Sequence, residues 1–485
     1  MSRARFIPYL GALVLCALSF VLARDTTRVQ FPEVRVVVRS LKPVLDPFLI
    51  ELEERTFHFF WDTANRQNGL VPDRYPTPSF ASIAAVGFGL TAYPIGVERR
   101  YITREAARQR VLLTLRFFRN ASQNPNLRGA TGYKGFFYHF LDMKTGERFE
   151  ASELSTVDTA LFLAGALFCQ SYFDRPDAEE AEIRDLVEEI YRRVDWRWAQ
   201  VRPPSISHGW TPEDGFLEYD WRGYNEAMLL YIIALGSPTF PVDADAWSEW
   251  TSTYDKTWRK DFGQEYLGFP PLFGHQYSHV WLDLRNIQDA YMRKRGLDYF
   301  ENTRRAIYAQ QAYAVANPLR CKDYGKTVWG ITASDGPADV EVEDGSGRRT
   351  FRSYTARGIG DAAAHDDCTL APTAVVASIP FAPDVAIPAV LDMNQRYGKY
   401  IYSTYGFLDA FNLSFTSDVP LRHGRSVPGF GWVDGDYLGI DQGAICAMIE
   451  NYRSAIIWRV MKRNAHVRRG LERAGFVGGW LTAPQ

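Results

Sequence analysis

Two carboxylates near the starts of predicted buried helices are the strongest candidates for chemistry in this sequence. Glu226 lies in the first turn of an apolar helix predicted at 225–237, and Asp441 heads another at 442–461. Burial disfavours a charged carboxylate, which suits Glu226 to donate a proton. The positive end of a helix dipole stabilises an anion, which suits Asp441 to accept one. Each residue could also have a purely structural role. Glu226 could stabilise its helix through the helix dipole, and Asp441 could be an N-cap.

Two further carboxylates, Glu153 and Asp158, border a helix predicted at 155–173. Glu153 stands outside the helix and is free to face a cleft. Asp158 follows Ser155 by three residues, which is also a capping-box pattern with a purely structural role. Glycoside hydrolysis needs two carboxyl groups across a groove, one protonated and one ionised, so this pattern favours a glycosidase.

Aromatic residues accompany the candidate carboxylates. They make up 14% of the chain, and Trp221 and Tyr224 precede Glu226, while Trp432 precedes Asp441. Aromatic rings stack against sugar faces but also fill protein cores. The sequence therefore predicts that these three residues bind substrate.

Metal and nucleotide chemistry have weak signals. His275 and His279 have the spacing of a zinc helix, but Gln276 stands where a metalloprotease needs its general base. Asp434-Gly-Asp436 lacks the further acidic positions of an EF-hand loop. Walker A and G-x-S-x-G patterns are absent from the sequence. We expect no metal and no cofactor.

The elements that must position these residues are helices that alternate between amphipathic and almost entirely apolar. This alternation predicts an all-α fold, an (α/α)6 toroid or barrel of about six helical hairpins with long active-site loops and minor β-hairpins. A solenoid of helical hairpins is the alternative. The predicted pairs are 48–63 with 82–97, 103–122 with 155–173, 177–198 with 225–237, 244–260 with 277–292, 297–317 with 366–380, and 384–398 with 442–461.

Inner helices of such a toroid run parallel, so their N-termini should converge on one face. The residues predicted to gather there are Asp158, Glu226, His279, Asp366 with Asp367, and Asp441. Strands are predicted at 134–140 and in a hairpin at 339–350 around Gly345.

The N-terminus has the pattern of an export signal. Arg3 and Arg5 precede an apolar run at 6–22, and Ala23 ends a plausible cleavage site. We expect a signal peptide or membrane anchor at 1–23, an extended lead-in at 24–46, a catalytic domain at 47–463 and a C-terminal tail at 464–485. The protein is then periplasmic or secreted, with an uncleaved anchor left open.

Charge and cysteines limit the partners. The formal net charge is −2, which argues against nucleic acid, and we infer no protein partner and expect a monomer. Cys169 and Cys446 lie in apolar runs and are expected to be buried thiols. Cys321 and Cys368 could form a disulfide in an oxidising compartment.

Several stretches resemble the glycoamylase-like bacterial glycoside hydrolases that include endo-β-1,2-glucanases, a domain also found in cyclic β-1,2-glucan synthases. The matching stretches are GLVPDR at 69–74, GFFYHFLD at 135–142, ELSTVDTA at 153–160, GYNEAM at 223–228, QYSHVW at 276–281, DQG at 441–443 and IENYR at 449–453.

This resemblance implies an (α/α)6 barrel and inverting, metal-free, endo-acting hydrolysis of β-1,2-glucan. Glu226 takes the general-acid position and Asp441 is the candidate base, although related enzymes can relay the proton through a substrate hydroxyl. The motifs predict that the substrate, an oligo- or polysaccharide, contacts Glu153, Asp158, Asp73, Arg74, Tyr138, Trp221, Tyr224, His279, Trp281 and Trp432. The segment 334–356 departs from the family pattern and is expected to reshape the cleft.

Three other functions stay open from the sequence. The chain could be a transglycosylase on the same linkage, a hydrolase of another glycan, or a non-catalytic periplasmic glycan-binding protein. A polysaccharide lyase is disfavoured, because its base constellation is not recognisable here.

Overall fold

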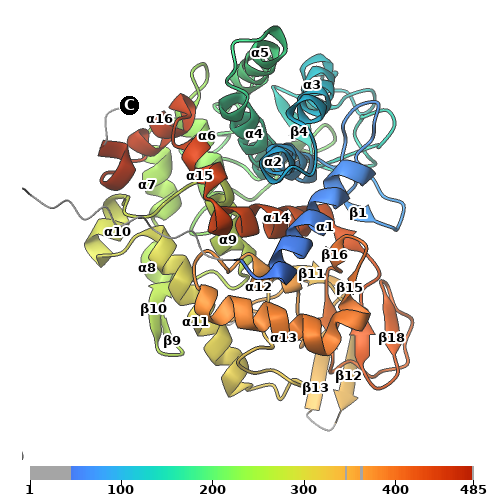
Figure 1. Cartoon of the computed structure of the whole chain (residues 1–485). Coiled ribbons are helices and arrows are strands. Elements are labelled where there is room, and N and C mark those ends of the chain that lie inside the picture. The colour runs from blue at the N-terminus through green and yellow to red at the C-terminus, as the bar shows by residue number, and fades with distance from the viewer. Residues whose placement is uncertain (1–44, 345–346, 361–363, 483–485) are drawn as a thin grey trace, which may run out of the picture. The chain divides into compact units, whose positions relative to one another are not determined.

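The computed structural model describes residues 45–344, 347–360 and 364–482 (Figure 1). The predicted signal segment at 1–23 and nearly all of the lead-in at 24–46 lie outside these residues. No helix in the described ranges is long and apolar enough to cross a membrane.

Outer and buried inner helices alternate along the described residues, six of each kind. The outer helices are α1 (Pro47–Thr63), α3 (Arg104–Asn120), α5 (Ala178–Arg192), α7 (Asp245–Thr251), α11 (Tyr299–Ala316) and α13 (Pro383–Ile401). The inner helices are α2 (Ile83–Arg99), α4 (Thr156–Tyr172), α6 (Met228–Gly236), α9 (Phe273–Trp281), α12 (Pro372–Val376) and α14 (Gly439–Arg453). The predicted (α/α)6 toroid is confirmed.

The inner helices α2 and α4 pack at very short range because glycines face each other. A Cβ atom on Gly165 would lie 2.0 Å from the Gly87 carbonyl oxygen, and one on Gly87 would lie 2.4 Å from that of Leu161. Both helices begin at a serine N-cap: Ser82 accepts a hydrogen bond from the Ala85 amide, and Ser155 accepts one from Asp158. Caps and glycines together set where these helices start and how closely they approach.

Four predicted helices are divided or shortened most strongly relative to their expected bounds. The segment 244–260 forms α7 and the short α8 (Tyr254–Thr257), and its last three residues belong to β9 (Trp258–Asp261). The chain turns after β9, at Phe262, and pairs β9 with β10 (Gln264–Leu267) in a hairpin. The segment 277–292 is wrong as one helix, because α9 ends at Trp281 and α10 (Ala290–Arg295) begins only after the Asp289 N-cap.

The other two breaks have clear local causes. The segment 366–380 becomes helical only at α12, because the Asp366 and Asp367 side chains bind other partners and Pro372 supplies the first helical residue. The segment 442–461 divides into α14 and α15 (Ile456–Met461) at Ala455, whose φ is +54°.

The predicted tail at 464–485 is part of the fold. Asn464 caps α16 (Ala465–Arg473), which packs against α6. A Cβ atom on Gly470 would lie 2.0 Å from the Ile232 carbonyl oxygen, so the two helices meet closely. A short 3-10 helix, η1 (Gly479–Thr482), follows.

Small antiparallel sheets carry the loops between the helices. The largest has the order β3-β4-β6-β7-β8, with Tyr138 opposite Leu154 and Leu154 opposite Trp210. Its strands are β3 (Gly132–Tyr133), β4 (Phe136–Tyr138), β6 (Leu154–Ser155), β7 (Gly209–Thr211) and β8 (Gly215–Phe216). The strand predicted at 134–140 corresponds to β4 and the first residue of β5 (Phe140–Leu141), which pairs with β2 (Ala81–Ser82).

The remaining strands form small two- and three-stranded antiparallel sheets. Three pairs are β1 (Arg74–Tyr75) with β20 (Tyr437–Leu438), β11 (Ala333–Asp335) with β14 (Tyr354–Ala356), and β15 (Tyr402–Ser403) with β16 (Gly406–Phe407). A three-stranded sheet has β19 (Gly431–Val433) between β17 (Phe411–Asn412) and β18 (Arg425–Val427). The predicted hairpin is formed by β12 (Val340–Asp344) and β13 (Gly347–Phe351), and its turn at Gly345 lies outside the described residues.

Candidate active site

The N-terminal ends of four inner helices line one cavity of about 310 Å³. Asp158 comes from α4, Glu226 from the residues just before α6, Tyr277 from α9 and Ile440 from α14. The predicted convergence of the inner helices is therefore confirmed for these four. The other residues that line the cavity are His139, Glu153, Ser155, Val157, Leu161, His208, Leu217, Trp221, Phe273 and Tyr354.

Glu226 reaches the cavity because α6 begins later than predicted. The Ala227 amide donates to Asn225 Oδ1, and this local turn delays the helix to Met228. Burial, with a smaller contribution from the charge of Asp158, raises the pKa of Glu226 to about 7. Its Oε2 atom is buried and has no hydrogen-bond partner among the described residues. Glu226 thus has the properties of a carboxylic acid that holds its proton near neutral pH.

His139 also lines the cavity and stands between two carboxylates. Its Nδ1 lies 2.8 Å from Glu153 Oε1 and its Nε2 lies 3.5 Å from Asp158 Oδ2. Burial alone would lower the pKa of His139, but the charges of Asp158 and Glu153 outweigh it and raise the pKa to about 9. The same contact lowers the pKa of Glu153 against the effect of burial. The Glu153 carboxylate is therefore held ionised.

A row of charged groups continues from this histidine to α14. Burial raises the pKa of Asp73 to about 6, although Arg74 and His139 lower it. Arg74 Nη1 lies 2.6 Å from Asp335 Oδ2, and the Asp73 carbonyl accepts a 2.7 Å hydrogen bond from the Gly439 amide at the start of α14. The β1 segment thereby connects the cavity to the helix that carries Asp441.

Asp441 lies behind the cavity wall. It is 3% exposed, and Tyr277 donates a 3.3 Å hydrogen bond to its Oδ1 atom. Burial raises the pKa of Asp441 to about 6, whereas hydrogen bonds from Asp409 and Tyr277 lower it. Tyr277 lines the cavity and Asp441 does not, so Tyr277 is the residue that connects Asp441 to the cavity.

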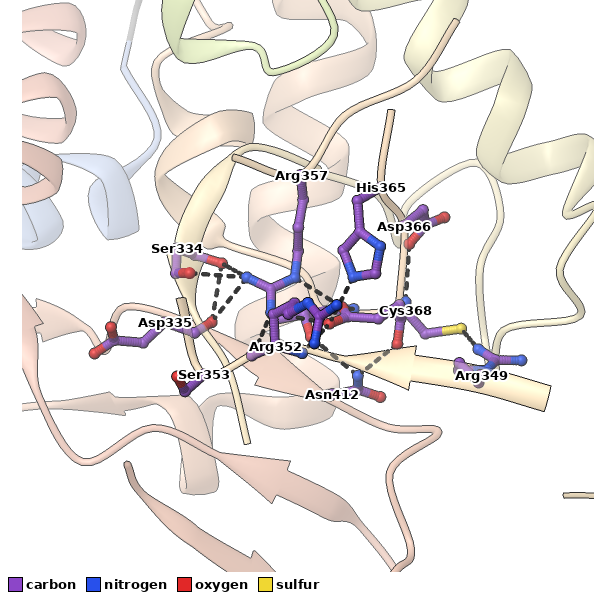
Figure 2. A network of polar contacts seen from close by, with 12 residues as sticks. Ser334, Asp335, Arg349, Arg352, Ser353, Arg357, His365, Asp366, Cys368 and Asn412 are labelled. Carbon is purple, nitrogen blue, oxygen red and sulfur yellow. Dashed lines mark hydrogen bonds and ion pairs between the residues drawn. The ribbon is translucent and has the colours of Figure 1, made fainter. Parts of the chain in front are cut away.

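A buried arginine, Arg357, lies at the centre of a polar network that includes Ser334 and Asp335 (Figure 2). The Arg357 guanidinium binds the Asp367 carboxylate through two hydrogen bonds of 2.7 and 2.9 Å. It also donates to the carbonyls of Ser334 and Asp335, which belong to β11. Arg357 therefore joins β11 to the segment that follows β14.

The disulfide that the sequence left open is formed in the same region. Cys321 and Cys368 are bonded, with their Cα atoms 5.5 Å apart and a sequence separation of 47. Cys169 and Cys446 are free and buried, as expected.

The structure brings part of the predicted site together. Glu153, Asp158, Trp221 and Glu226 line the cavity, while Asp73, Arg74 and Asp441 lie in the adjoining charged row. Trp221 is held by a 3.0 Å hydrogen bond from its indole to Thr156 and stacks on His208, with ring centroids 3.8 Å apart.

Five residues predicted to bind substrate lie elsewhere. Trp281 donates to Thr91, and Trp432 donates to the His423 carbonyl; both indoles are fully buried in the core. Tyr138 is also fully buried, with the Arg148 guanidinium over its ring.

His279 and Tyr224 are the other two corrections. His279 lies in the last turn of α9, where burial lowers its pKa to about 3, and its Nε2 is 3.2 Å from Thr303 Oγ1. It is therefore not at a helix start, and neither are Asp366 and Asp367. Tyr224 stacks on Tyr299 and lines a separate cavity of about 230 Å³.

Sequence reasoning missed His139, Tyr277, Tyr354, His208 and Asp335. The first two stand inside the quoted motifs, one place after Tyr138 and two places before His279. Tyr354 and Asp335 come from the segment 334–356, which was expected to reshape the cleft but without named residues.

The fold and site define a toroid whose inner-helix ends present carboxylates to one cavity. Residues 218–465 match the glycoamylase family model, described as putative glucoamylase. The match covers about half of the chain, and the protein belongs to this family.

Individual relatives agree with this assignment. The chain is 26% identical to an exo β-1,2-glucooligosaccharide sophorohydrolase (non-reducing end) of Parabacteroides distasonis, over 97% of this chain and 63% of that protein. It thus spans less than two thirds of that curated relative.

Two solved structures match most of both chains. An endo-β-1,2-glucanase from Chitinophaga pinensis, bound to sophorotriose and glucose, has a TM-score of 0.75 and 26% identity over 89% of this chain and 98% of its own. A protein of Bacteroides uniformis described as a putative glucoamylase has a TM-score of 0.75 and 28% identity. The match covers 90% of this chain and 98% of the Bacteroides chain.

Proposed function

We propose that this protein is a glycoside hydrolase that cleaves β-1,2-linked glucan, with Glu226 as the general acid. The observation that carries the proposal is the Glu226 carboxyl, which faces a cavity that Glu153 and Asp158 also line, and whose pKa burial raises to about 7. Such a group protonates the leaving glycosidic oxygen at neutral pH. The relatives named for β-1,2-glucan and β-1,2-glucooligosaccharides support the choice of linkage.

Asp441 is the proposed general base. It accepts a hydrogen bond from Tyr277, whose ring lines the cavity, so the tyrosine hydroxyl can pass a proton from water or a sugar hydroxyl to the carboxylate. Asp158 is the competing base, because its carboxylate lines the cavity directly. We assign Asp158, Glu153 and His139 to binding sugar hydroxyls.

Inversion and endo action remain part of the proposal and rest on the family resemblance. Tyr354 narrows the cavity from the segment 334–356, and this contact is where chain-length preference would be set. Product lengths from a long glucan distinguish endo from exo cleavage and reveal any transglycosylation. The anomer that is first released, followed by NMR, distinguishes inversion from retention.

Export to the periplasm or the medium is also proposed, with the protein acting as a monomer. The disulfide between Cys321 and Cys368 supports an oxidising compartment, since such bonds are rare where thiols are kept reduced. Secretion of the full chain from a heterologous bacterial host, with the size of the mature protein, tests this point.

Kinetics of four variants on linear β-1,2-glucan test the assignments. We expect Glu226→Gln and Asp441→Asn each to lower kcat by about 10²–10⁴-fold. Tyr277→Phe should lower kcat if it relays the proton, whereas Asp158→Asn should mainly raise KM. Glu182→Gln, on the exposed face of α5, is the matched control and should leave both constants unchanged. If Asp441→Asn kept a normal kcat and Asp158→Asn lost most of its kcat, Asp158 would be the general base instead of Asp441.

A further inference from the structure

Three buried aspartates outside the cavity converge from separate segments of the chain. Asp335 ends β11, Asp409 stands just before β17, and Asp434 follows β19. One carboxylate oxygen from each lies within 4.8 Å of the other two. We call these three residues the aspartate triad; they are 0–2% exposed.

Positive charge around the triad is scarce. Arg74 pairs with Asp335 at 2.6 Å, and His423 lies 3.8 Å from the same carboxylate. His423 Nδ1 also faces an Arg74 nitrogen at 3.2 Å, so it accepts that hydrogen bond and is neutral. Asp436 adds a fourth carboxylate, 3.8 Å from Arg74. One guanidinium thus faces at least four carboxylates in this part of the described structure.

Two oxygens of the triad have no partner. Asp409 Oδ1 and Asp434 Oδ2 are buried and lack a hydrogen bond among the described residues. Their other oxygens are held in place, because Asp409 Oδ2 accepts from the Asp335 amide at 2.8 Å and Asp434 Oδ1 accepts from the Gly435 amide at 2.6 Å. Asp409 also faces Asp441: burial raises the pKa of Asp409, and the charge of Asp441 and a hydrogen bond to it raise that pKa further. A buried unpaired carboxylate is costly and requires a proton or a cation.

A second buried acid pair is balanced in a different way. Glu53 pairs with Arg453 at 2.7 Å, and Glu450 pairs with Arg99 at 3.0 Å. This pair has one guanidinium for each carboxylate, whereas the triad and Asp436 share Arg74. Glu53 Oε1 and Glu450 Oε2 are also buried and lack a hydrogen-bond partner among the described residues. The ratio of guanidinium to carboxylate groups is therefore what distinguishes the triad from this pair.

We propose that Asp335, Asp409 and Asp434 bind a calcium ion. Carboxylate oxygens are the ligands that hard divalent cations prefer, and Ca²⁺ accepts six to eight oxygens at about 2.3–2.6 Å in adaptable geometry. Oxygens on opposite sides of such an ion are about 4.6–5.2 Å apart, which the triad can match. Asp335 then bridges Arg74 and the ion, and Asp409 and Asp434 supply their unpaired oxygens. This site departs from the metal-free chain expected from the sequence.

Calcium binding is measured on the full chain after EDTA treatment and removal of the chelator. We expect calorimetry to give one Ca²⁺ per chain, and Ca²⁺ at 100 times its Kd to raise the Tm by about 3 °C. Asp434→Asn and Asp409→Asn should weaken binding at least tenfold and lose this shift. Glu450→Gln removes a buried carboxylate from the balanced pair. This variant should keep both the Ca²⁺ affinity and the shift in Tm of the wild-type chain.

Several results would overturn the proposal. These are no Ca²⁺ binding by the wild-type chain, tighter binding of Mg²⁺ than of Ca²⁺, or Ca²⁺ binding that persists in both aspartate variants. If the variants do not fold, Tb³⁺ replaces them as the probe of the wild-type chain. Its emission, sensitised by Trp432 two residues from Asp434, should be displaced by Ca²⁺ and weakened in Trp432→Phe. Unchanged emission in Trp432→Phe would place the ion elsewhere.

Discussion

The substitution Glu226→Gln should stabilise the protein at alkaline pH while it removes activity. Burial raises the pKa of Glu226 from 4.5 to about 7, so the folded state favours the protonated form. Below pH 4.5 both the folded and unfolded states hold the proton and the group costs nothing. Above pH 7 both are ionised and the folded state carries the full penalty, which glutamine relieves.

The size of the effect follows from the difference in pKa. A shift of about 2.5 units corresponds to about 3.4 kcal/mol at 1.36 kcal/mol per unit. Glu226 keeps part of its surface in contact with the cavity, so solvent screening reduces this to about 1.5–3 kcal/mol. The gain in stability of the variant should be near zero at pH 4.5 and largest at pH 8.

Urea unfolding of wild type and variant at both pH values measures this difference. Glu153→Gln is the matched control in the same cavity, and its effect should have the opposite sign. His139 lowers the pKa of Glu153, so that carboxylate stabilises the folded state at neutral pH and loses its contribution as the pH falls. Equal changes in stability at pH 4.5 and pH 8 for Glu226→Gln would refute the raised pKa and, with it, the role as an acid.

Three further predictions concern the framework of the site and are measured by urea unfolding against wild type. Arg357→Met should cost about 3–5 kcal/mol, because it leaves the buried Asp367 carboxylate uncompensated; a loss below about 1 kcal/mol would contradict this. Replacing Cys321 with serine under non-reducing conditions should lower the free energy of unfolding by about 4 kcal/mol, because the disulfide no longer closes a loop with a sequence separation of 47 in the unfolded chain. Wild type in reducing agent should lose as much stability. Gly165→Ala should cost at least about 1–3 kcal/mol, since its Cβ would lie 2.0 Å from the Gly87 carbonyl oxygen, and an unchanged midpoint would contradict the close packing.

The long, uniformly apolar or clearly amphipathic helices could be predicted from the sequence. Helices α2 and α4 agree with their predicted segments to within two residues, because a serine cap marks each start and apolar side chains continue to each end. The segments 277–292 and 366–380 failed for a common reason. Their boundaries depend on contacts with distant residues, such as the Asp367 carboxylate with Arg357, which local periodicity does not contain.

Individual site residues were harder to predict than the helices. The motif at 276–281 pointed to the right helix but to the wrong side chains, since Tyr277 lies near its cavity end while His279 and Trp281 lie deeper. Glu226 and Asp158 were predictable because polar residues at the start of an apolar helix stand out. The aspartate triad was not, because its members are 25 to 99 residues apart and only tertiary structure unites them.

The release of reducing ends from linear β-1,2-glucan by the purified chain is the most direct test of the central claim. The same assay includes β-1,3- and β-1,4-glucan and the Glu226→Gln variant. We predict release from the β-1,2-glucan alone, with loss of at least 99% of the rate in the variant, about 10²-fold or more. Absence of release from β-1,2-glucan, or undiminished release by the variant, would contradict the assignment of Glu226 as the acid of a β-1,2-glucanase.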